Sequence, residues 1–175
     1  GTKHPILVQA SERVDFQFLE ELQCNLIPVN VGANYWINED AFYPTANVNK
    51  VYDIIMVSIW SEFKRHYHLF SALSKCKNKT DIKVCLVGKS FPLSTDYIVN
   101  LCRYYDVERN VDIYENISQN KINELMNQSK VCLLLSKKEG FNKSIIEAMY
   151  ADVPAFVLKG LNYGERYDYI NSKTG

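Results

Sequence analysis

The sequence has 175 residues, of which 47% are hydrophobic and 23% are charged, with 20 basic and 20 acidic side chains. This is the composition of a globular domain, and the balanced charge lacks the basic surplus that is typical of nucleic-acid-binding proteins. No apolar stretch approaches the about 20 residues of a membrane-spanning helix, so the sequence predicts none.

The first 50 residues contain one short strand–helix–strand pattern and then a segment without a clear period. Ile6–Ala10 is typical of a strand, Ser11 of a helix N-cap, and Leu26–Val31 of a second extended run. The predicted helix has its apolar side chains on one face: Val14, Phe18, Leu19 and Leu22. Residues 33–50 are rich in aromatic side chains, which we expect to pack against the rest of the protein.

Strands and helices alternate from Tyr52 to the end of the sequence. The pattern predicts strands at Asp53–Ile59, Ile82–Val87, Val111–Tyr114, Val131–Leu135 and Ala155–Leu158. It predicts helices at Glu62–Lys75, Ser94–Tyr105 and Ser118–Asn127, from Lys143 onward and from Tyr163 onward. This alternation is typical of an α/β fold with a Rossmann-like, doubly wound parallel sheet. The unbroken apolar run of Val131–Leu135 predicts an interior strand that is buried on both faces.

Neither the cysteines nor the histidines have the spacing of a metal site. Five cysteines occur singly: Cys24, Cys76, Cys85, Cys102 and Cys132. We expect buried free thiols in a reducing, cytoplasmic environment rather than disulfides. His66 and His68 are two residues apart on a predicted helix and face different directions, so we expect no zinc site.

The turn after Val131–Leu135 contains the residues that are most suited to binding a ligand. Gly140 lies in the turn, Asn142 is a good helix N-cap, and the first N–H groups of a helix from Lys143 suit an anion.

Two carboxylates flank this helix start. Glu139 precedes it and Glu147 lies in its second turn, and both are good acceptors for the hydroxyl groups of a sugar or a ribose. The spacing leaves an alternative open, in which Glu139 only favours the helix dipole and Glu147 pairs with Lys143 one turn earlier.

The segment Glu139-Gly-Phe-Asn-Lys-Ser-Ile-Ile-Glu147-Ala-Met resembles the signature of the retaining GT-B glycosyltransferases of family 4, also called glycosyl transferases group 1. The following Ala151–Val157 resembles the turn and strand that come next in that family, whereas Asn142 replaces its common second glycine. The resemblance implies a glycosyltransferase of the hexosyltransferase type that transfers a sugar from a nucleotide diphosphate sugar with retention. It implies no metal or other cofactor.

The resemblance also implies roles for individual residues. Glu139 would be the catalytic residue that holds the sugar hydroxyls, and Glu147 would hold the ribose. The other residues of the implied donor site are Lys64, Arg65, Ile117, Gly140, Phe141, Asn142 and Lys143. Ile117 belongs to it because it follows the third strand of the sheet, where the family holds the base.

Lys64 and Arg65 lie at the beginning of the predicted helix Glu62–Lys75, beside the carboxyl edge of the sheet. Cations there neutralise a diphosphate leaving group. Lys64 falls on the family's lysine, but the arginine expected six residues earlier is Ser58, so Arg65 would have to replace it. From the residues alone, a solvated Lys–Arg pair is an equally good interpretation. Gly88 resembles the family's Val-Gly, but a glycine that simply ends the strand explains it equally well.

By this resemblance, residues 1–50 are the end of an N-terminal domain and the inter-domain linker. Residues 51–175 are then the C-terminal nucleotide-sugar-binding domain of a GT-B fold, truncated at its C-terminus. We expect the missing N-terminal domain to bind the acceptor (a glycan, lipid or protein), and any membrane association to need that missing part. This half alone would then be inactive, and surface glycan biosynthesis is the common destination in the family.

The alternative function is a non-catalytic Rossmann-like module that regulates or binds another protein, which the fold alone does not exclude. A receiver domain would need an acidic pair at its strand ends, and a dinucleotide-binding domain would need Gly-x-Gly-x-x-Gly after the first strand. The strand ends Ser58–Trp60 and Glu115–Asn116 contain no aspartate pair, and Ser58–Glu62 contains no glycine.

Overall fold

The computed structural model describes residues 3–10, 13–29, 31, 33–140 and 142–158, and its main feature is a sheet of five parallel strands. The strands are β3 (Tyr52–Trp60), β4 (Val84–Ser90), β5 (Val111–Glu115), β6 (Ser129–Leu134) and β7 (Ala155–Val157). Their order is β5-β4-β3-β6-β7, so β6 is an interior strand, as its apolar run predicted. The predicted doubly wound parallel sheet is therefore confirmed.

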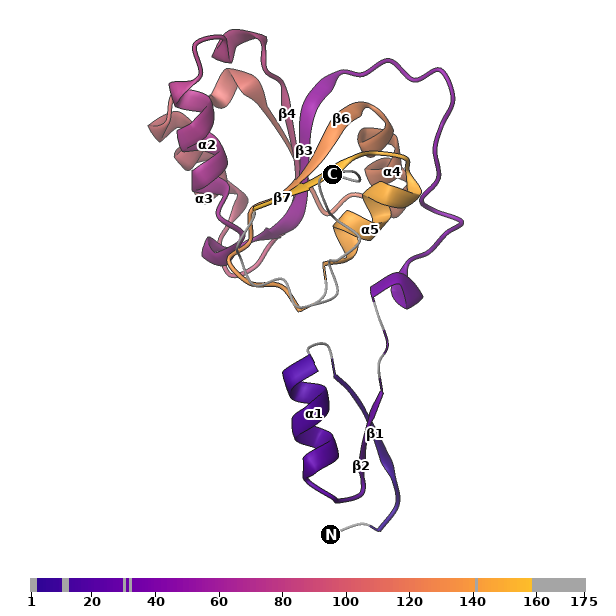
Figure 1. The fold of residues 1–175 in the computed structure, drawn as a ribbon. Helices are drawn as coiled ribbons and strands as arrows, with labels where there is room; N and C mark the ends of the chain where they lie inside the picture. Colours follow the sequence, from indigo (N-terminus) through magenta and orange to yellow (C-terminus); the bar gives the residue numbers. More distant parts are fainter. Residues whose placement is uncertain (1–2, 11–12, 30, 32, 141, 159–175) are drawn as a thin grey trace.

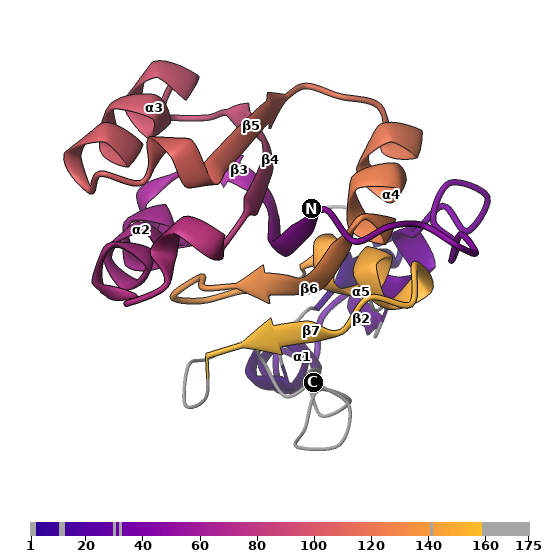
Figure 2. The same cartoon turned by 90° about the horizontal axis from the view of Figure 1, so that it is seen from above.

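Helices cover both faces of this sheet (Figures 1 and 2). The helices on one face are α2 (His66–Lys75) and α3 (Thr95–Tyr104), and those on the other are α4 (Gln119–Asn127) and α5 (Lys143–Tyr150). The short 3-10 turns are η1 (Ala33–Trp36), η2 (Glu62–Lys64), η3 (Lys79–Asp81) and η4 (Glu108–Asn110). Ser94 and Ser118 cap α3 and α4, because the side chain of each accepts a hydrogen bond from the first turn.

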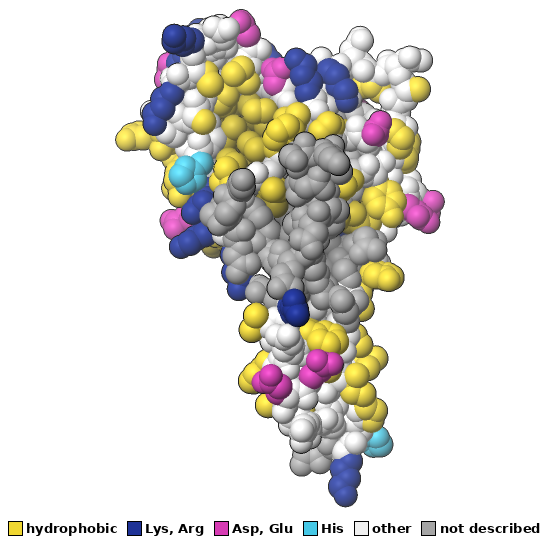
Figure 3. All heavy atoms as spheres, viewed as in Figure 1, with side chains coloured by type: hydrophobic (Ala, Val, Ile, Leu, Met, Phe, Trp, Pro, Cys, Tyr) yellow, Lys and Arg dark blue, Asp and Glu magenta, His cyan; other side chains and the backbone are white. Residues whose placement is uncertain are grey.

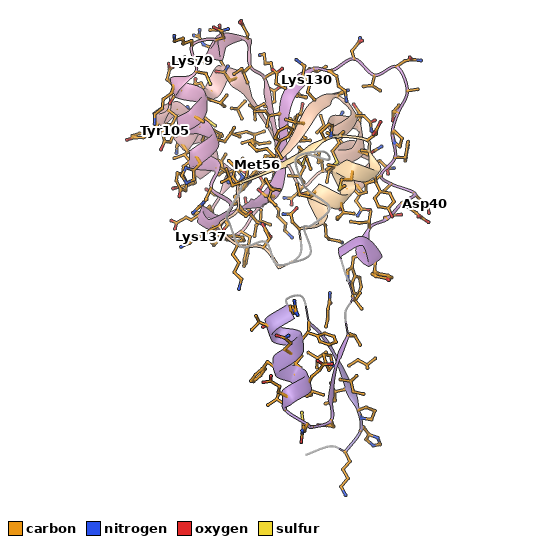
Figure 4. The ribbon with its side chains drawn as sticks, in the orientation of Figure 1. Asp40, Met56, Lys79, Tyr105, Lys130 and Lys137 are labelled. Carbon is orange, nitrogen blue, oxygen red and sulfur yellow. The ribbon has the colours of Figure 1, made fainter. Side chains whose placement is uncertain are left out.

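The sheet separates two hydrophobic cores, and neighbouring residues of a strand enter different ones. Ile55 of β3 packs in the core under α4 and α5, whereas Met56, labelled in Figure 4, packs in the core under α2 and α3. The first core includes Leu125, Met126, Cys132, Ile145 and Ala148, and the second includes Leu69, Phe70, Leu86, Ile98 and Cys102. Burial on both faces explains the continuous apolar runs within the central strands.

A second, two-stranded parallel sheet precedes the main one (Figure 1). It consists of β1 (Ile6–Gln9) and β2 (Leu26–Val29), connected by α1 (Arg13–Glu21); the predicted cap Ser11 lies outside the described residues. None of the residues of α1 is buried. Figure 3 shows exposed hydrophobic side chains over this lower part of the molecule. The exposed ones include Ile6, Leu7, Val14, Phe18, Leu22 and Ile27.

The segment between the two sheets is attached to α4. Phe42 is buried in the core under α4 and α5, as expected for an aromatic residue here. The side chain of Asn127 accepts a hydrogen bond from Thr45 N at 2.7 Å and donates one to Tyr43 O at 3.0 Å. The expectation for the other aromatics is wrong, because three are exposed: Tyr35, Trp36 and Tyr43.

Most predicted boundaries shift by one or two residues, and two larger differences have a structural reason. The helix expected from Glu62 begins only at His66, because Arg65 has φ 60° and its left-handed backbone separates η2 from α2. Gly88 does not end β4, which continues to Ser90. A Cβ at Gly88 would lie 2.6 Å from the Trp60 ring, so the glycine provides space for that ring. The helix predicted from Tyr163 lies outside the described residues.

Candidate functional site

The order of the strands reverses between β3 and β6, and the ligands of doubly wound sheets bind at this position, outside the carboxyl ends of the strands. β3 pairs with β4 as far as Trp60↔Ser90, but with β6 only as far as Ile55↔Cys132. Beyond Ile55, β3 is therefore not paired with β6. The segments that follow them, η2 after β3 and the loop 135–142 after β6, carry most of the predicted site residues.

Lys64 of η2 and Glu139 of the loop after β6 form a buried ion pair, in which Lys64 Nζ donates to Glu139 Oε1. The exposed fractions of the two residues are only 8% and 7%. A buried charge without a partner is costly, so each residue stabilises the other. Lys137 N donates to Phe63 O at 3.0 Å and connects the same two segments beside the pair. Two residues that were predicted separately, a phosphate ligand and a sugar ligand, thus contact each other.

Next to this pair lies the buried His66, which is not among the predicted site residues. His66 Nε2 is 3.1 Å from Ser58 Oγ, and its ring meets the Trp60 ring edge-on at 5.3 Å between centroids. Burial and, to a smaller extent, the charge of Lys64 together lower the pKa of His66 to about 4. His66 is therefore neutral at neutral pH. Its place directly after the Lys–Arg pair was the available signal.

α5 begins at Lys143, as predicted, with Asn142 as its N-cap. Asn142 Oδ1 accepts hydrogen bonds from Ile145 N at 3.2 Å and from Ser144 Oγ. Asparagine thus caps the helix where the resembling family commonly has glycine. The N–H groups of Lys143 and Ser144 belong to the first turn and have no acceptor within the helix.

Glu147 lies in the second turn of α5 and is buried, with 9% of the residue exposed. Burial raises the pKa of Glu147, and attraction to Lys143 partly opposes this. In the part of the chain that the structure describes, its carboxylate forms no hydrogen bond and no ion pair. Glu147 and Lys143 thus attract each other, as the alternative interpretation expects, but they form no direct ion pair in the described residues, since the lysine is exposed and the glutamate is buried. A buried carboxylate without a hydrogen-bond donor is available to ligand hydroxyls.

Arg65 is next to Lys64 in sequence but does not join the Lys64–Glu139 pair. It is half-buried and lines a surface hollow of about 480 Å³. The other residues of this hollow are Glu62, Phe63, Tyr67, Tyr97 and Lys137. Lys137 is labelled in Figure 4. The two cations thus occupy different surroundings, one buried against Glu139 and one at the surface.

The remaining predicted residues lie around the same edge of the sheet. Ile117 follows β5 and packs, half-buried, against the core under α4 and α5. Gly140 is half-buried in the loop after β6, and Phe141 lies outside the described residues. Ser136 was not among the predicted residues. Its Oγ is the only fully buried side-chain polar atom of the described residues without a hydrogen-bond partner. Its short distance in sequence from Glu139 was the only signal.

Within the described ranges, no group of three or more His, Cys, Asp or Glu residues has an arrangement that could hold a metal ion. No helix of those ranges is long and apolar enough to cross a membrane. The five cysteines are free thiols; Cys85, Cys102 and Cys132 are buried, whereas Cys24 and Cys76 are exposed, contrary to the expectation of buried thiols. Burial raises the pKa of Cys85, Cys102 and Cys132 to about 12, so these three thiols stay protonated.

Comparison with known proteins identifies a family. Residues 38–170 match the family model described as "Glycosyl transferases group 1". A curated relative, the N-acetyl-alpha-D-glucosaminyl L-malate synthase of Bacillus anthracis, is 29% identical over 105 residues. The match covers 58% of this chain and 26% of that enzyme.

Solved glycosyltransferase structures of the GT-B type have the same fold. Sucrose-phosphate synthase from Thermosynechococcus elongatus superposes with a TM-score of 0.67 at 20% identity, over 86% of this chain and 40% of that one. HepE of Anabaena, in complex with UDP and glucose, has a TM-score of 0.68 at 17% identity, over 94% and 47%. A TarM variant of S. aureus in complex with UDP superposes with a TM-score of 0.70 at 18% identity, over 98% of this chain and 33% of that one. The chain thus spans about a quarter of the curated relative and less than half of each of these structures.

Proposed function

The chain belongs to the glycosyl transferases group 1 family, and from this premise we propose that it binds the nucleotide diphosphate sugar from which a glycosyltransferase transfers a sugar to an acceptor. One observation carries the proposal. At the carboxyl edge between β3 and β6, the buried Lys64 pairs with the buried Glu139 of the loop that leads into α5, and a second buried carboxylate, Glu147, lies in the second turn of that helix. Cations and helix N–H groups bind phosphate, and carboxylates bind hydroxyls. The UDP in the HepE and TarM structures agrees with a nucleoside diphosphate as the ligand.

In this proposal each residue has one contact with the donor. Lys64 and the first N–H groups of α5, at Lys143 and Ser144, bind the diphosphate and stabilise its charge as it leaves. Glu147 accepts hydrogen bonds from the ribose hydroxyls. Glu139 is the catalytic residue that accepts hydrogen bonds from the hydroxyls of the transferred sugar. Ile117 contacts the base at the end of β5.

The chemistry and the domain arrangement complete the proposal. Transfer retains the anomeric configuration, as in family 4, and uses no metal or other cofactor, because Lys64 and the helix start supply the positive charge. Residues 51–175 form the donor-binding C-terminal domain, and residues 1–50 belong to the end of an N-terminal domain and the linker. The exposed apolar side chains of β1, α1 and β2 support this division, because a larger domain would cover them.

The residues of the donor site do not bind the acceptor. We propose that it is a glycan, a lipid or a protein held by the N-terminal domain, in the biosynthesis of a surface glycan that begins from cytoplasmic nucleotide sugars.

Calorimetric titration tests this function. UDP, ADP and GDP are titrated into the wild-type chain with and without a chelator, with NAD as a comparison. We expect one nucleoside diphosphate to bind, with equal affinity in the presence of the chelator. Glu147→Gln should weaken its binding by about 1–3 kcal/mol, because a charged hydrogen bond is lost.

The matched control is Glu124→Gln, which removes the same charge from an exposed position on α4 and should bind like the wild type. Strict dependence on a divalent metal, or a preference for NAD, would contradict the proposal. Binding of none of these ligands would favour the alternative, a non-catalytic Rossmann-like module.

A further inference from the structure

We propose that the Lys64–Glu139 ion pair is a switch that opens when the donor binds and closes again after the sugar has left, so that it promotes release of the nucleoside diphosphate product. This inference rests on the proposed function, because it assumes that a diphosphate binds at Lys64. It adds a competition between the ligand and a carboxylate of the chain itself.

The first step of the argument is that Lys64 already has an anionic partner. Its Nζ donates to Glu139 Oε1, and both residues are almost completely buried. A diphosphate that contacts the same ammonium group must therefore compete with this carboxylate. The free energy of breaking the ion pair is subtracted from the affinity of every ligand that binds there.

The second step concerns Glu139 after the pair has opened. Its carboxylate is then a buried charge without its cation, which is a costly state. The hydroxyls of a sugar next to the diphosphate can donate hydrogen bonds to it and offset this cost. A nucleoside diphosphate without a sugar offers no such donors. The switch therefore favours the intact donor over the product.

The third step is that the exchange needs only side-chain movement. The hydrogen bond from Lys137 N to Phe63 O connects the segments of Lys64 and Glu139 independently of the ion pair. Both residues thus stay close to each other while the lysine is bound to phosphate. When the sugar has been transferred, Glu139 is in place to bind Lys64 again and to displace the diphosphate.

Two variants of Glu139 test the switch. UDP, ADP and GDP are titrated calorimetrically into the wild type, Glu139→Gln and Glu139→Asp. Glu139→Gln should bind the preferred nucleoside diphosphate about tenfold more tightly than the wild type, which corresponds to about 1.4 kcal/mol. Glu139→Asp keeps the charge but shortens the side chain, so its affinity should lie between the two. Compared with the wild type, Glu139→Gln should bind UDP-glucose and UDP-N-acetylglucosamine less tightly relative to UDP.

The control is Glu62→Gln, which removes a negative charge from an exposed residue of the same 3-10 turn. Glu62→Gln should bind the nucleoside diphosphate like the wild type. If its affinity rises as much as that of Glu139→Gln, the effect is a general one of charge and the switch is overturned. If the wild type binds and neither Glu139 variant binds more tightly, the switch is wrong and the proposed function stands. If neither the wild type nor the variants bind any of the ligands, both are wrong. Glu139→Asp decides the matter if Glu139→Gln does not fold.

Discussion

The buried His66 makes the stability of the protein depend on pH in a range where few other side chains titrate. In the folded state its pKa is about 4, because burial disfavours the charged ring and Lys64 repels it. In the unfolded chain it returns to 6.5. Between these values the unfolded state binds more protons than the folded state. The free energy of unfolding therefore falls as the pH falls from 6.5 to about 4, and this contribution is fully present only above 6.5.

The size of the effect follows from the two pKa values. At about 1.4 kcal/mol per pH unit, the difference between 6.5 and about 4 corresponds to about 3 kcal/mol. His66→Asn removes the titrating ring but keeps a side chain that can bond to Ser58 Oγ. The variant should lose this part of the pH dependence. Glu147, whose pKa is raised, changes stability in the opposite direction, but equally in both proteins.

Urea unfolding of the wild type and His66→Asn at several pH values between 7 and 4.5 measures the effect as a difference. As the pH falls from 7 to 4.5, we expect the free energy of unfolding of the wild type to decrease by about 2–3 kcal/mol more than that of His66→Asn. His68→Asn, an exposed histidine of the same helix, is the control and should follow the wild-type profile. A difference between the wild type and His66→Asn that does not change with pH would refute the reasoning.

Two further substitutions test the packing around the site. Gly88→Ala places a Cβ 2.3 Å from Ser58 O, a backbone atom that cannot move freely. We therefore expect the free energy of unfolding, measured in urea, to fall by about 1–3 kcal/mol. An unchanged midpoint would contradict the packing of the Trp60 ring against Gly88. Asn142→Ala removes the N-cap of α5 and should cost about 1 kcal/mol, whereas Asn142→Gly should cost only a few tenths. Equal stability of the wild type and Asn142→Ala, measured by thermal unfolding, would show that the cap contributes nothing.

The sheet and the start of α5 were predictable because their signals are local. A strand that is buried on both faces needs a continuous apolar run, and the part of β6 from Val131 to Leu134 shows this in its own sequence. A helix that follows a turn needs a cap, and Asn142 provides it immediately before the apolar period begins. Neither inference required knowledge of distant residues.

The contacts within the site were not predictable in the same way. Lys64 and Glu139 are 75 residues apart in the sequence, so no local pattern indicates that they pair. The space that Gly88 provides depends on the Trp60 ring of the neighbouring strand. The break at Arg65 has no signal, since the left-handed conformation favours glycine or asparagine. Helical spacing predicted an interaction between Glu147 and Lys143, but it did not indicate that the glutamate is buried while the lysine is exposed.

The central claim is that a nucleoside diphosphate binds at the carboxyl edge of the sheet between β3 and β6. Backbone amide NMR of the isotopically labelled chain during titration with UDP, ADP or GDP tests it most directly. The account predicts shift changes that are largest at Lys64, Ile117 and the first turn of α5, Lys143 and Ser144. Changes confined to the opposite, amino edge of the sheet, or an absence of changes with all three nucleotides, would contradict it.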